Sequence, residues 1–121
     1  MIKKSAEITG NVLHDFKGGS GKITLFGFMD EKEANGAGRL FAKTVIEPGC
    51  SVGEHTHEGD MEAYYFLKGK ALVSDNGTDV ILEAGDCHIC ADGQSHSIKN
   101  AGGDTLEYIA IVLHTKQKEV C

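Results

Sequence analysis

The fold of this chain can be inferred outward from residues 49–69, GCSVGEHTHEGDMEAYYFLKG. This stretch places His55, His57 and Glu62 within eight residues, and His96 follows in a second stretch punctuated by glycines. Imidazole nitrogens and a carboxylate oxygen are ligands that suit a divalent transition metal. Two histidines that are two positions apart share one face of an extended strand, so both can reach one ion. The stretch therefore predicts a metal site built on a strand.

The composition around this stretch favours an all-β fold. The chain has 121 residues, a length typical of one domain with its own core. It contains 16 glycines, 1 proline and 40% hydrophobic residues. Many glycines between short runs of valine, isoleucine, leucine, phenylalanine and tyrosine indicate short strands joined by turns, as in a sandwich or barrel. No stretch suggests a long helix.

Apolar runs bounded by turn residues predict where the strands lie. Asn76-Gly77 is a good signal for a type I′ turn. Gly69 is expected to turn residues 62–67 back onto residues 70–74 as a hairpin. The other extended segments are expected at residues 7–13, 22–29, 39–47, 54–57, 80–83, 87–90, 96–100 and 106–114.

We expect a single domain over residues 1–121. Residues 1–38 are predicted to form an N-terminal arm and strands, ending in a polar loop that could carry a helical turn before its glycines stop it. Residues 39–113 are predicted to form the core of the barrel. Residues 114–121 are predicted to be a polar tail that frays.

Glycines bracket the ligand candidates of the first stretch at fixed spacings. Five residues separate Gly49 from His55, and one residue separates His55 from His57. Four residues then lead to Glu62, and six more lead to Gly69. A tight turn after His57 would fold the chain back, so that the carboxylate can approach the imidazoles.

A second stretch, beginning fifteen residues after the first ends, has its own signature. It runs from Gly85 through Ala91-x-Gly93 and His96 to Asn100. Together the two stretches closely resemble the two sequence motifs of the cupin superfamily. Ala91 stands where the second motif has a proline, a departure that loosens a turn but removes no ligand.

The resemblance covers residues 39–113 and implies a cupin-type β-barrel, also called a double-stranded β-helix or jelly roll. It also implies that His55, His57, Glu62 and His96 bind one divalent metal ion (Mn, Fe, Ni, Co or Zn). Four protein ligands on an octahedral ion leave two positions open for a small molecule. The alternative is a polar barrel lining whose metal has been lost, and against it all four ligands are present.

Side-chain alternation suggests which residues could line a pocket. If Glu62 points inward, Tyr64 and Phe66 point the same way. By the same parity Ser51 lies near the mouth of the metal site, and Ile98 lies beside His96. Aromatic residues in a barrel are more often simple core, and that alternative stays open.

Three basic residues could also contact a ligand. Arg39 and Lys43 share one face of their strand, and either could receive a substrate carboxylate if that face is inward. A surface ion pair is the more ordinary role for both. His88 stands where the resembling sequences generally have an apolar residue. It could be an acid–base group, or simply a histidine that faces solvent or is satisfied by a neighbour.

The cysteines give little evidence of redox function. Cys87 and Cys90 spell C-x-x-C, but residues three apart on a strand face opposite sides, which makes a poor chelate and a poor disulfide. The N-terminus has two lysines and no apolar run that could act as a signal peptide. We therefore expect a cytoplasmic protein whose thiols are mostly reduced.

The charge argues against polyanionic partners. The net charge is −6, the isoelectric point is near 5.4, and Arg39 is the only arginine. Nucleic-acid binding requires a basic stripe that this chain lacks, so we expect no nucleic-acid partner. We expect no membrane partner for the same reason, and no stretch approaches the length of a membrane span.

Three functions are compatible with this pattern. The first is a metal-dependent enzyme, such as a dioxygenase, decarboxylase or isomerase, that acts on a small oxygen-rich metabolite. A decarboxylase would also need a positioned acid, which Asp30, Glu31 or Glu33 could supply. The second is a metal-containing module that binds a small molecule without turnover. The third, ranked last, is a purely structural barrel.

The outward residues of the barrel predict self-association. Tyr65 and Leu67 alternate with the inward-facing positions of their strand, and a barrel this small leaves open edges and apolar surface to cover. We expect a homodimer, the commonest symmetric assembly.

Overall fold

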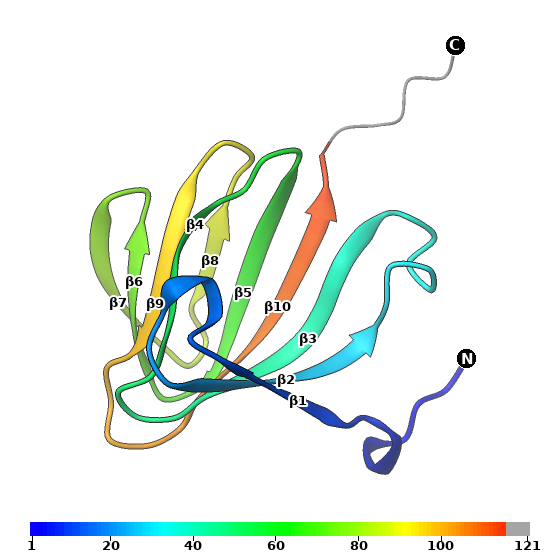
Figure 1. The fold of residues 1–121 in the computed structure, drawn as a ribbon, viewed down its shortest axis with the longest axis horizontal. Helices are drawn as coiled ribbons and strands as arrows, with labels where there is room; N and C mark the ends of the chain where they lie inside the picture. Colours follow the sequence, from blue (N-terminus) through cyan, green and yellow to red (C-terminus); the bar gives the residue numbers. More distant parts are fainter. Residues whose placement is uncertain (116–121) are drawn as a thin grey trace.

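Ten strands form two antiparallel sheets in the computed structural model of this chain, which describes residues 1–115 (Figure 1). The six-stranded sheet has the order β1 (Gly10–His14), β2 (Lys22–Met29), β3 (Gly38–Ile46), β10 (Leu106–His114), β5 (Asp60–Lys68) and β8 (Cys87–Cys90). The four-stranded sheet has the order β4 (Ser51–Thr56), β9 (Ser95–Asn100), β6 (Lys70–Asp75) and β7 (Thr78–Glu83). The expected all-β jelly roll is confirmed.

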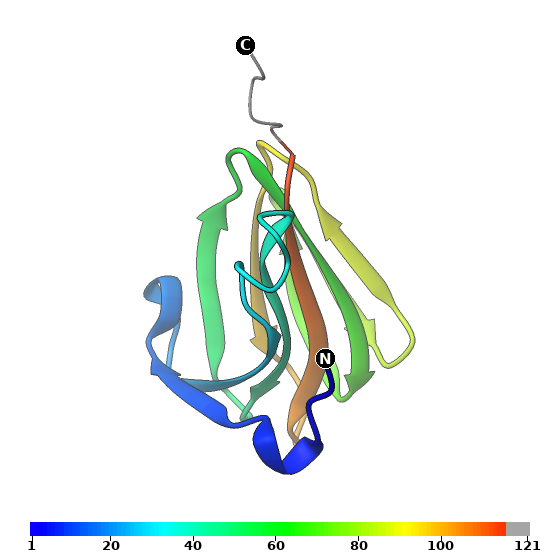
Figure 2. The same cartoon turned by 90° about the vertical axis from the view of Figure 1, so that its right-hand side faces the viewer.

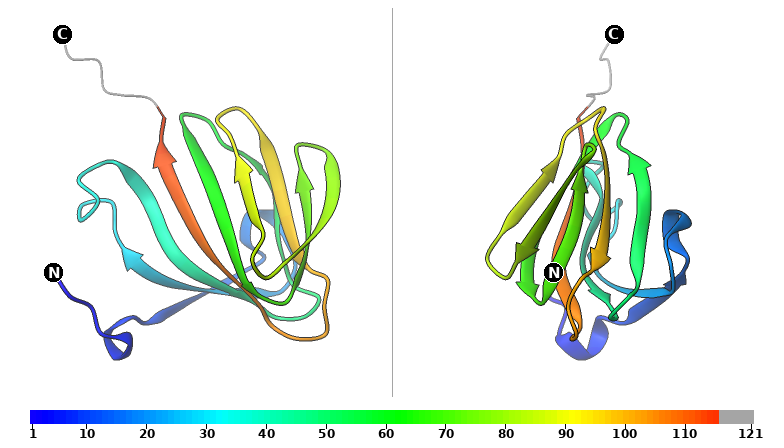
Figure 3. Two further views of the ribbon diagram at one scale, coloured as in Figure 1. Left: turned by 180° about the vertical axis from the view of Figure 1, so that it is seen from behind. Right: turned by 90° about the vertical axis from the view of Figure 1, so that its left-hand side faces the viewer.

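The core lies between the two sheets, which face each other (Figures 2 and 3). Strict alternation along β5 and β10 turns Tyr64, Phe66 and Tyr108 inward, where all three are buried. Val73 and Ile98 meet them from the four-stranded sheet. Burial of these apolar side chains is the main force that holds the layers together.

The chain changes sheets at Gly69, which corrects the expected hairpin. β5 pairs with β8 and β10, whereas β6 pairs with β7 and β9. Gly69 has a φ of 89°, and a Cβ there would lie 2.7 Å from the carbonyl oxygen of Thr105. The glycine is therefore needed for a close backbone crossing rather than for a two-residue turn.

Other turns agree with the sequence. Asn76 and Gly77 both have positive φ angles, as a type I′ turn between β6 and β7 requires. Residues 30–37 form a helical turn in which Ala34 N–H donates to the carbonyl oxygen of Asp30 at 3.0 Å. β1 begins at Gly10, later than expected, because Ser5–Glu7 form a short 3-10 turn, η1. Of the predicted tail, residues 116–121 lie outside the described residues.

A second short 3-10 segment, η2 (Phe16–Gly18), follows β1 and packs against β4 (Figure 2). The contact is backbone to backbone, because a Cβ at Gly53 would collide with the carbonyl oxygen of Lys17. No helix among residues 1–115 is both long enough and apolar enough to cross a bilayer.

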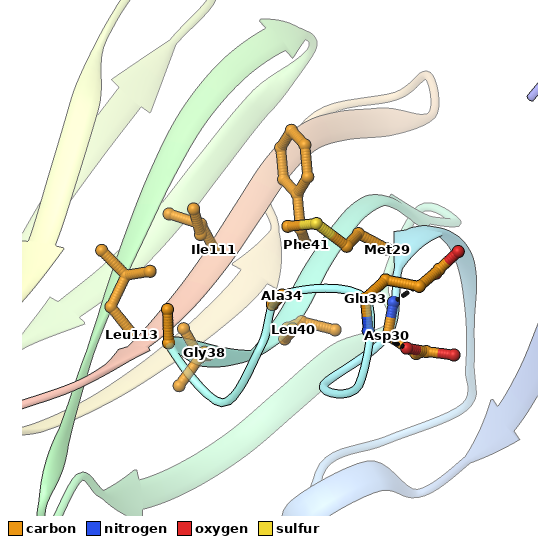
Figure 4. A pocket seen from close by; sticks show the side chains of 11 residues that line it. Met29, Asp30, Glu33, Ala34, Gly38, Leu40, Phe41, Ile111 and Leu113 are labelled. Carbon is orange, nitrogen blue, oxygen red and sulfur yellow. Dashed lines mark hydrogen bonds between the residues drawn. The ribbon is translucent and has the colours of Figure 1, made fainter. Parts of the chain in front are cut away.

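The outer face of the six-stranded sheet carries an apolar row. Phe41, Ile111, Ala63 and Ile89 are cross-strand neighbours on β3, β10, β5 and β8, which lie side by side in Figure 3. At one end of the row is a groove of about 300 Å³ between the 30–37 loop and the ends of β3 and β10. Figure 4 shows Phe41 and Ile111 at this groove, together with Met29, Leu40 and Leu113.

Candidate metal centre

Four ligand candidates meet between the sheets. His55 of β4 and His96 of β9 are direct cross-strand partners in the four-stranded sheet. Glu62 comes from β5 of the opposite sheet, and His57 lies just beyond the end of β4. One ligand atom from each of the four lies within 4.8 Å of the others. Pairing of β4 with β9 thus brings together His55 and His96, which are 41 residues apart in the sequence.

The three imidazoles turn the same nitrogen toward a common centre. The Nε2 atom of His96 lies 3.0 Å from Nε2 of His55 and 3.1 Å from Nε2 of His57. The Oε1 atom of Glu62 lies 2.9 Å from Nε2 of His96 and 3.2 Å from Nε2 of His57. His96, His57 and Glu62 are buried, and His55 is half-buried.

Each imidazole has a partner at its other nitrogen. Nδ1 of His55 lies 2.8 Å from the carbonyl oxygen of Gly53, and Nδ1 of His57 lies 2.7 Å from Oδ1 of Asp60. Both partners only accept, so these Nδ1 atoms carry the proton and their Nε2 lone pairs face inward. Nδ1 of His96 lies 3.1 Å from Nε2 of His88, and the His88 imidazole can accept a hydrogen bond there.

This arrangement fits a divalent cation. Lone pairs that face one another at 3.0–3.1 Å repel unless a proton or a cation lies between them. Two nitrogen ligands at right angles around an ion ~2.1 Å away would themselves be separated by ~3.0 Å. Borderline nitrogen donors with one hard carboxylate oxygen suit the first-row divalent metals.

The carboxylate at the centre is strongly held in its charged form. Burial alone would raise the pKa of Glu62, but the surrounding imidazoles of His55, His57 and His96 outweigh it and hold that pKa far below its usual range. The hydrogen bond to Glu62 in turn raises the pKa of His57, against the opposing effect of burial. A cation would take the place of the protons that these contacts favour.

Arg39 and Asp60 extend the hydrogen-bond chain from His57 to the surface. Arg39 Nε donates to Oδ2 of Asp60 at 2.9 Å, while Oδ1 of Asp60 accepts from His57. Arg39 lies where the register of β3 against β10 shifts, a bulge that re-aims its side chain. Burial opposes ionisation of Asp60, but the bonds from Arg39 and His57 outweigh it and lower its pKa.

Two further groups support the centre from behind. Tyr64 donates from its hydroxyl to Oε1 of Glu62 at 3.0 Å, and its ring stacks on His96 with centroids 5.2 Å apart. Burial raises the pKa of Tyr64 well above its usual range, so it stays a donor. His88 is 6% exposed, and burial lowers its pKa, which keeps it neutral and able to accept from His96.

A cavity of about 280 Å³ opens onto the cluster. His55, His57, Glu62 and Tyr64 line its inner end, and Arg39 lies nearer the surface with 45% of its side chain exposed. Among the described residues that line this cavity, Glu62 is the only carboxylate. The rest of the lining comes from Leu13, Phe16, Lys17, Ile23, Leu25, Leu40, Thr44, Val52, Tyr108 and Ala110.

Several residues suggested for the pocket lie elsewhere. Lys43 points to the outer face, where it pairs with Glu107, because the bulge at Arg39 separates the two basic residues. Phe66 and Ile98 do point inward but pack in the core. His88 reaches the centre only through His96, and Ser51 accepts a hydrogen bond from the backbone of Ser20 on the other side of β4.

The acidic loop does not reach the cavity. Asp30 and Glu33 line the groove on the outer side of β3, where their side chains accept from each other's backbone N–H (Figure 4). Glu31 accepts from His114 at 3.0 Å. The suggested decarboxylase acid is therefore not at the centre. Cys87 is exposed and Cys90 is buried, as expected for opposite faces of one strand, and both are free thiols.

The partners of the imidazoles were not predicted from the sequence. Glu54, Thr56 and Glu58 are adjacent to the histidines in the chain, but all three are exposed. The actual partner Asp60 follows His57 by three residues, a spacing that suits a carboxylate in the intervening turn. His88 came from another strand, and no local pattern could have joined it to His96.

Comparison with known proteins agrees with the resemblance of the two motifs to those of cupins. A family model described as a cupin domain matches residues 42–112. A protein of Thermotoga maritima described as an oxalate-binding protein is 39% identical over 113 residues, which cover 93% of each chain. A crystal structure of a predicted oxalate decarboxylase from Thermotoga maritima has 38% identity and a TM-score of 0.91, covering 94% of this chain and 99% of that one. The polyketide cyclase RemF from Streptomyces resistomycificus shares the fold alone, at 18% identity and a TM-score of 0.72, covering 98% of this chain and 89% of that one.

Proposed function

This chain belongs to the cupin family, and we propose that it binds one divalent transition-metal ion through His55, His57, Glu62 and His96. The observation that carries the proposal is the convergence of three Nε2 atoms and Oε1 of Glu62, with each imidazole held by a partner at Nδ1. Without a cation the Nε2 lone pairs would face one another at hydrogen-bond distance. The donor set fits Mn, Fe, Ni, Co or Zn, and affinity order alone does not select among them.

We propose that the ligand of this centre is a small oxygen-rich acid. The relative described as an oxalate-binding protein supports this class. A bound metal would act as a Lewis acid toward two adjacent oxygens of such a molecule. Arg39 and Lys17 would attract an anion to the mouth, and the buried walls would exclude water from it. Dioxygenase, decarboxylase and isomerase chemistry all begin with this binding mode.

A non-catalytic binding module is the second candidate. It is favoured by the cavity lining, in which Glu62 is the only carboxylate among the described residues. Glu62 and Asp60 are both engaged with imidazoles, so neither is free to deliver a proton to a substrate. Turnover would then have to rely on the metal and on Tyr64 or Tyr108.

Elemental analysis of protein purified without chelator tests the metal. We expect about one metal ion per chain, and Glu62→Gln should lose most of it. Glu54→Gln is the matched control, because Glu54 is exposed on the same motif. Wild-type protein that holds no metal after incubation with each of the five ions would refute the proposal.

A substrate panel followed by mass spectrometry separates the two candidates. Oxalate and other short 2-oxo or 2-hydroxy acids should bind to the metal-loaded protein. Product formation that disappears in Glu62→Gln identifies an enzyme. Binding without product in the presence and absence of oxygen identifies the binding module.

We also propose that two copies pair through the outer face of the six-stranded sheet. Ile89 of the apolar row is 57% exposed there, and Tyr65 on the same strand as Ala63 is 51% exposed. Exposed apolar surface that is continuous over four strands is uncommon on monomers. A two-fold axis through this face would bury it against itself.

A further inference from the structure

We infer that the ligand of the metal centre carries an apolar body, as in a 2-oxo carboxylate with a branched-alkyl or aryl side chain. The inference rests on the proposed function, because it assumes that the metal holds the oxygen end of the ligand. It goes beyond the oxalate named for the relative, since oxalate consists of two joined carboxylates and has no apolar part.

The lining of the cavity combines two kinds of chemistry. Its charged and imidazole lining includes His55, His57 and Glu62. Elsewhere its wall is mostly hydrocarbon, from side chains of β1, η2, β2, β3 and β4. They include Leu13, Phe16, Leu25, Leu40 and Val52. A ligand whose oxygens reach the metal must therefore place whatever follows them against this apolar wall.

The size of the cavity supports the same conclusion. At about 280 Å³ it lies close to the lower end of the ~300–1,000 Å³ range of small-molecule pockets. A two-carbon diacid would leave most of that space to water against hydrocarbon, which is unfavourable. A ligand with a larger hydrocarbon side chain would fill more of it.

The charges at the mouth select an anion. Lys17 and Arg39 are both exposed and both line the cavity, and the Nζ atom of Lys17 lies 5.4 Å from the ring centroid of Phe16. Arg39 is partly neutralised by Asp60, so Lys17 is the less compensated cation. These charges would guide a carboxylate inward. The hydrocarbon wall favours a different part of the ligand, an apolar group.

The apolar wall is pre-formed. η2 is seated on β4 by the close contact of Gly53 with the backbone of Lys17, and a Cβ at Gly19 would likewise collide with the carbonyl oxygen of Ser51. Phe16 is therefore held at the cavity by backbone packing rather than by a ligand. A pre-formed apolar wall favours ligands that already match it.

Calorimetric titration of the metal-loaded protein with matched ligands tests the inference. Pyruvate and 4-methyl-2-oxopentanoate share one chelating group and differ only in the apolar body. We expect 4-methyl-2-oxopentanoate to bind about ten- to a hundredfold more tightly than pyruvate. Oxalate serves as the control ligand that has no apolar body. The metal content is measured on the same samples.

A pair of variants locates the effect. Phe16→Ser should reduce the preference for 4-methyl-2-oxopentanoate to within about threefold while the affinity for pyruvate changes little. Ile81→Ser, at an exposed position on β7, is the control and should keep the full preference. A preference that survives in Phe16→Ser would overturn the placement of the apolar body on this wall.

The wild-type measurements alone can refute the inference. Equal affinity for the two oxo acids, in protein that holds its metal and binds oxalate, would overturn the apolar body and leave the proposed function intact. Absence of bound metal would instead overturn the proposed function. The two failures are therefore distinguishable without any variant.

Discussion

Three histidines of the metal centre are oriented by three different acceptors. His55 uses a backbone carbonyl, His57 uses the carboxylate of Asp60, and His96 uses the imidazole of His88. A carboxylate partner raises the basicity of its histidine more than a neutral partner does. Asp60 therefore raises the basicity of His57, whereas His96 depends on a neutral neighbour.

Replacing His88 should weaken the centre without removing a ligand. His88→Leu leaves Nδ1 of His96 without an acceptor in a buried position, so metal affinity should fall about ten- to a hundredfold. His88→Gln, which can still accept, should recover part of the loss. Competition with a chromophoric chelator measures both, and His14→Leu on exposed β1 is the control. An affinity for His88→Leu within threefold of wild type would show that this contact is incidental.

At the scale of residues, spacing predicted the ligands but not their surroundings. His55, His57 and Glu62 follow one strand and one turn, so their proximity is nearly local. The contact of His88 with His96 depends on the register of β8 against β5 and on the meeting of two sheets. No single stretch of sequence contains that information.

Among the elements, η2 and β4 are in close backbone contact near the site. Gly53 has two roles. Its lack of a side chain leaves room for the backbone of Lys17, and its carbonyl oxygen accepts a hydrogen bond from His55. The position of η2, and with it the cavity wall, is thus coupled to the orientation of one ligand.

Adding a single methyl group at this contact should therefore be costly. Gly53→Ala should lower the free energy of unfolding by about 1–3 kcal/mol, because the backbone of η2 has to move. Gly27→Ala is a matched control on β2, where an added Cβ meets no atom within 4 Å. Urea denaturation of both variants measures the difference. Equal stability of the two would show that η2 yields easily and that the wall is not pre-formed.

The strands themselves were largely predictable, and the connection at Gly69 was not. Alternation and turn residues marked most strands to within two residues, as for β8, which matches residues 87–90. The hairpin between residues 62–67 and 70–74 was wrong, because a turn of this length is compatible with pairing or with crossing to the facing sheet. Long-range pairing of β5 with β10 decided between them.

Over the whole molecule, the metal centre joins the two sheets. His55 and His96 belong to the four-stranded sheet, and Glu62 belongs to the six-stranded sheet. A bound ion would therefore act as a cross-link of the sandwich, and its binding free energy would add to that of folding.

Removal of the metal should accordingly lower the melting temperature. Free metal at about a thousand times its dissociation constant stabilises the folded state by about 4 kcal/mol. For a domain of this size that corresponds to roughly 10 °C or more. Scanning calorimetry with and without chelator measures the shift. Glu62→Gln should show little of it, and an equal shift in that variant would indicate binding elsewhere.

The proposed dimer predicts a response confined to one face. Ile89→Lys places a charge in the outer apolar row and should convert a dimer into a monomer in sedimentation velocity experiments. Ile81 is 53% exposed on β7 of the other sheet, so Ile81→Lys should leave the dimer intact. A wild-type monomer at high concentration would contradict the pairing. The cytoplasmic location and the absence of a nucleic-acid partner stay predictions.

Most of the apolar wall precedes the ion-holding residues in the chain, with Val52 as an exception. Leu13, Phe16 and Leu25 precede residue 42, whereas the four ligands fall inside the matched range 42–112. A chimaera that takes residues 1–41 from a relative should thus change the choice of organic acid. Its affinity for the ion should change only through Arg39, which holds Asp60, and through η2, which packs on Gly53. Exchange of this one leading segment would therefore alter the surroundings of the organic ligand while leaving all four ion-holding residues in the chain.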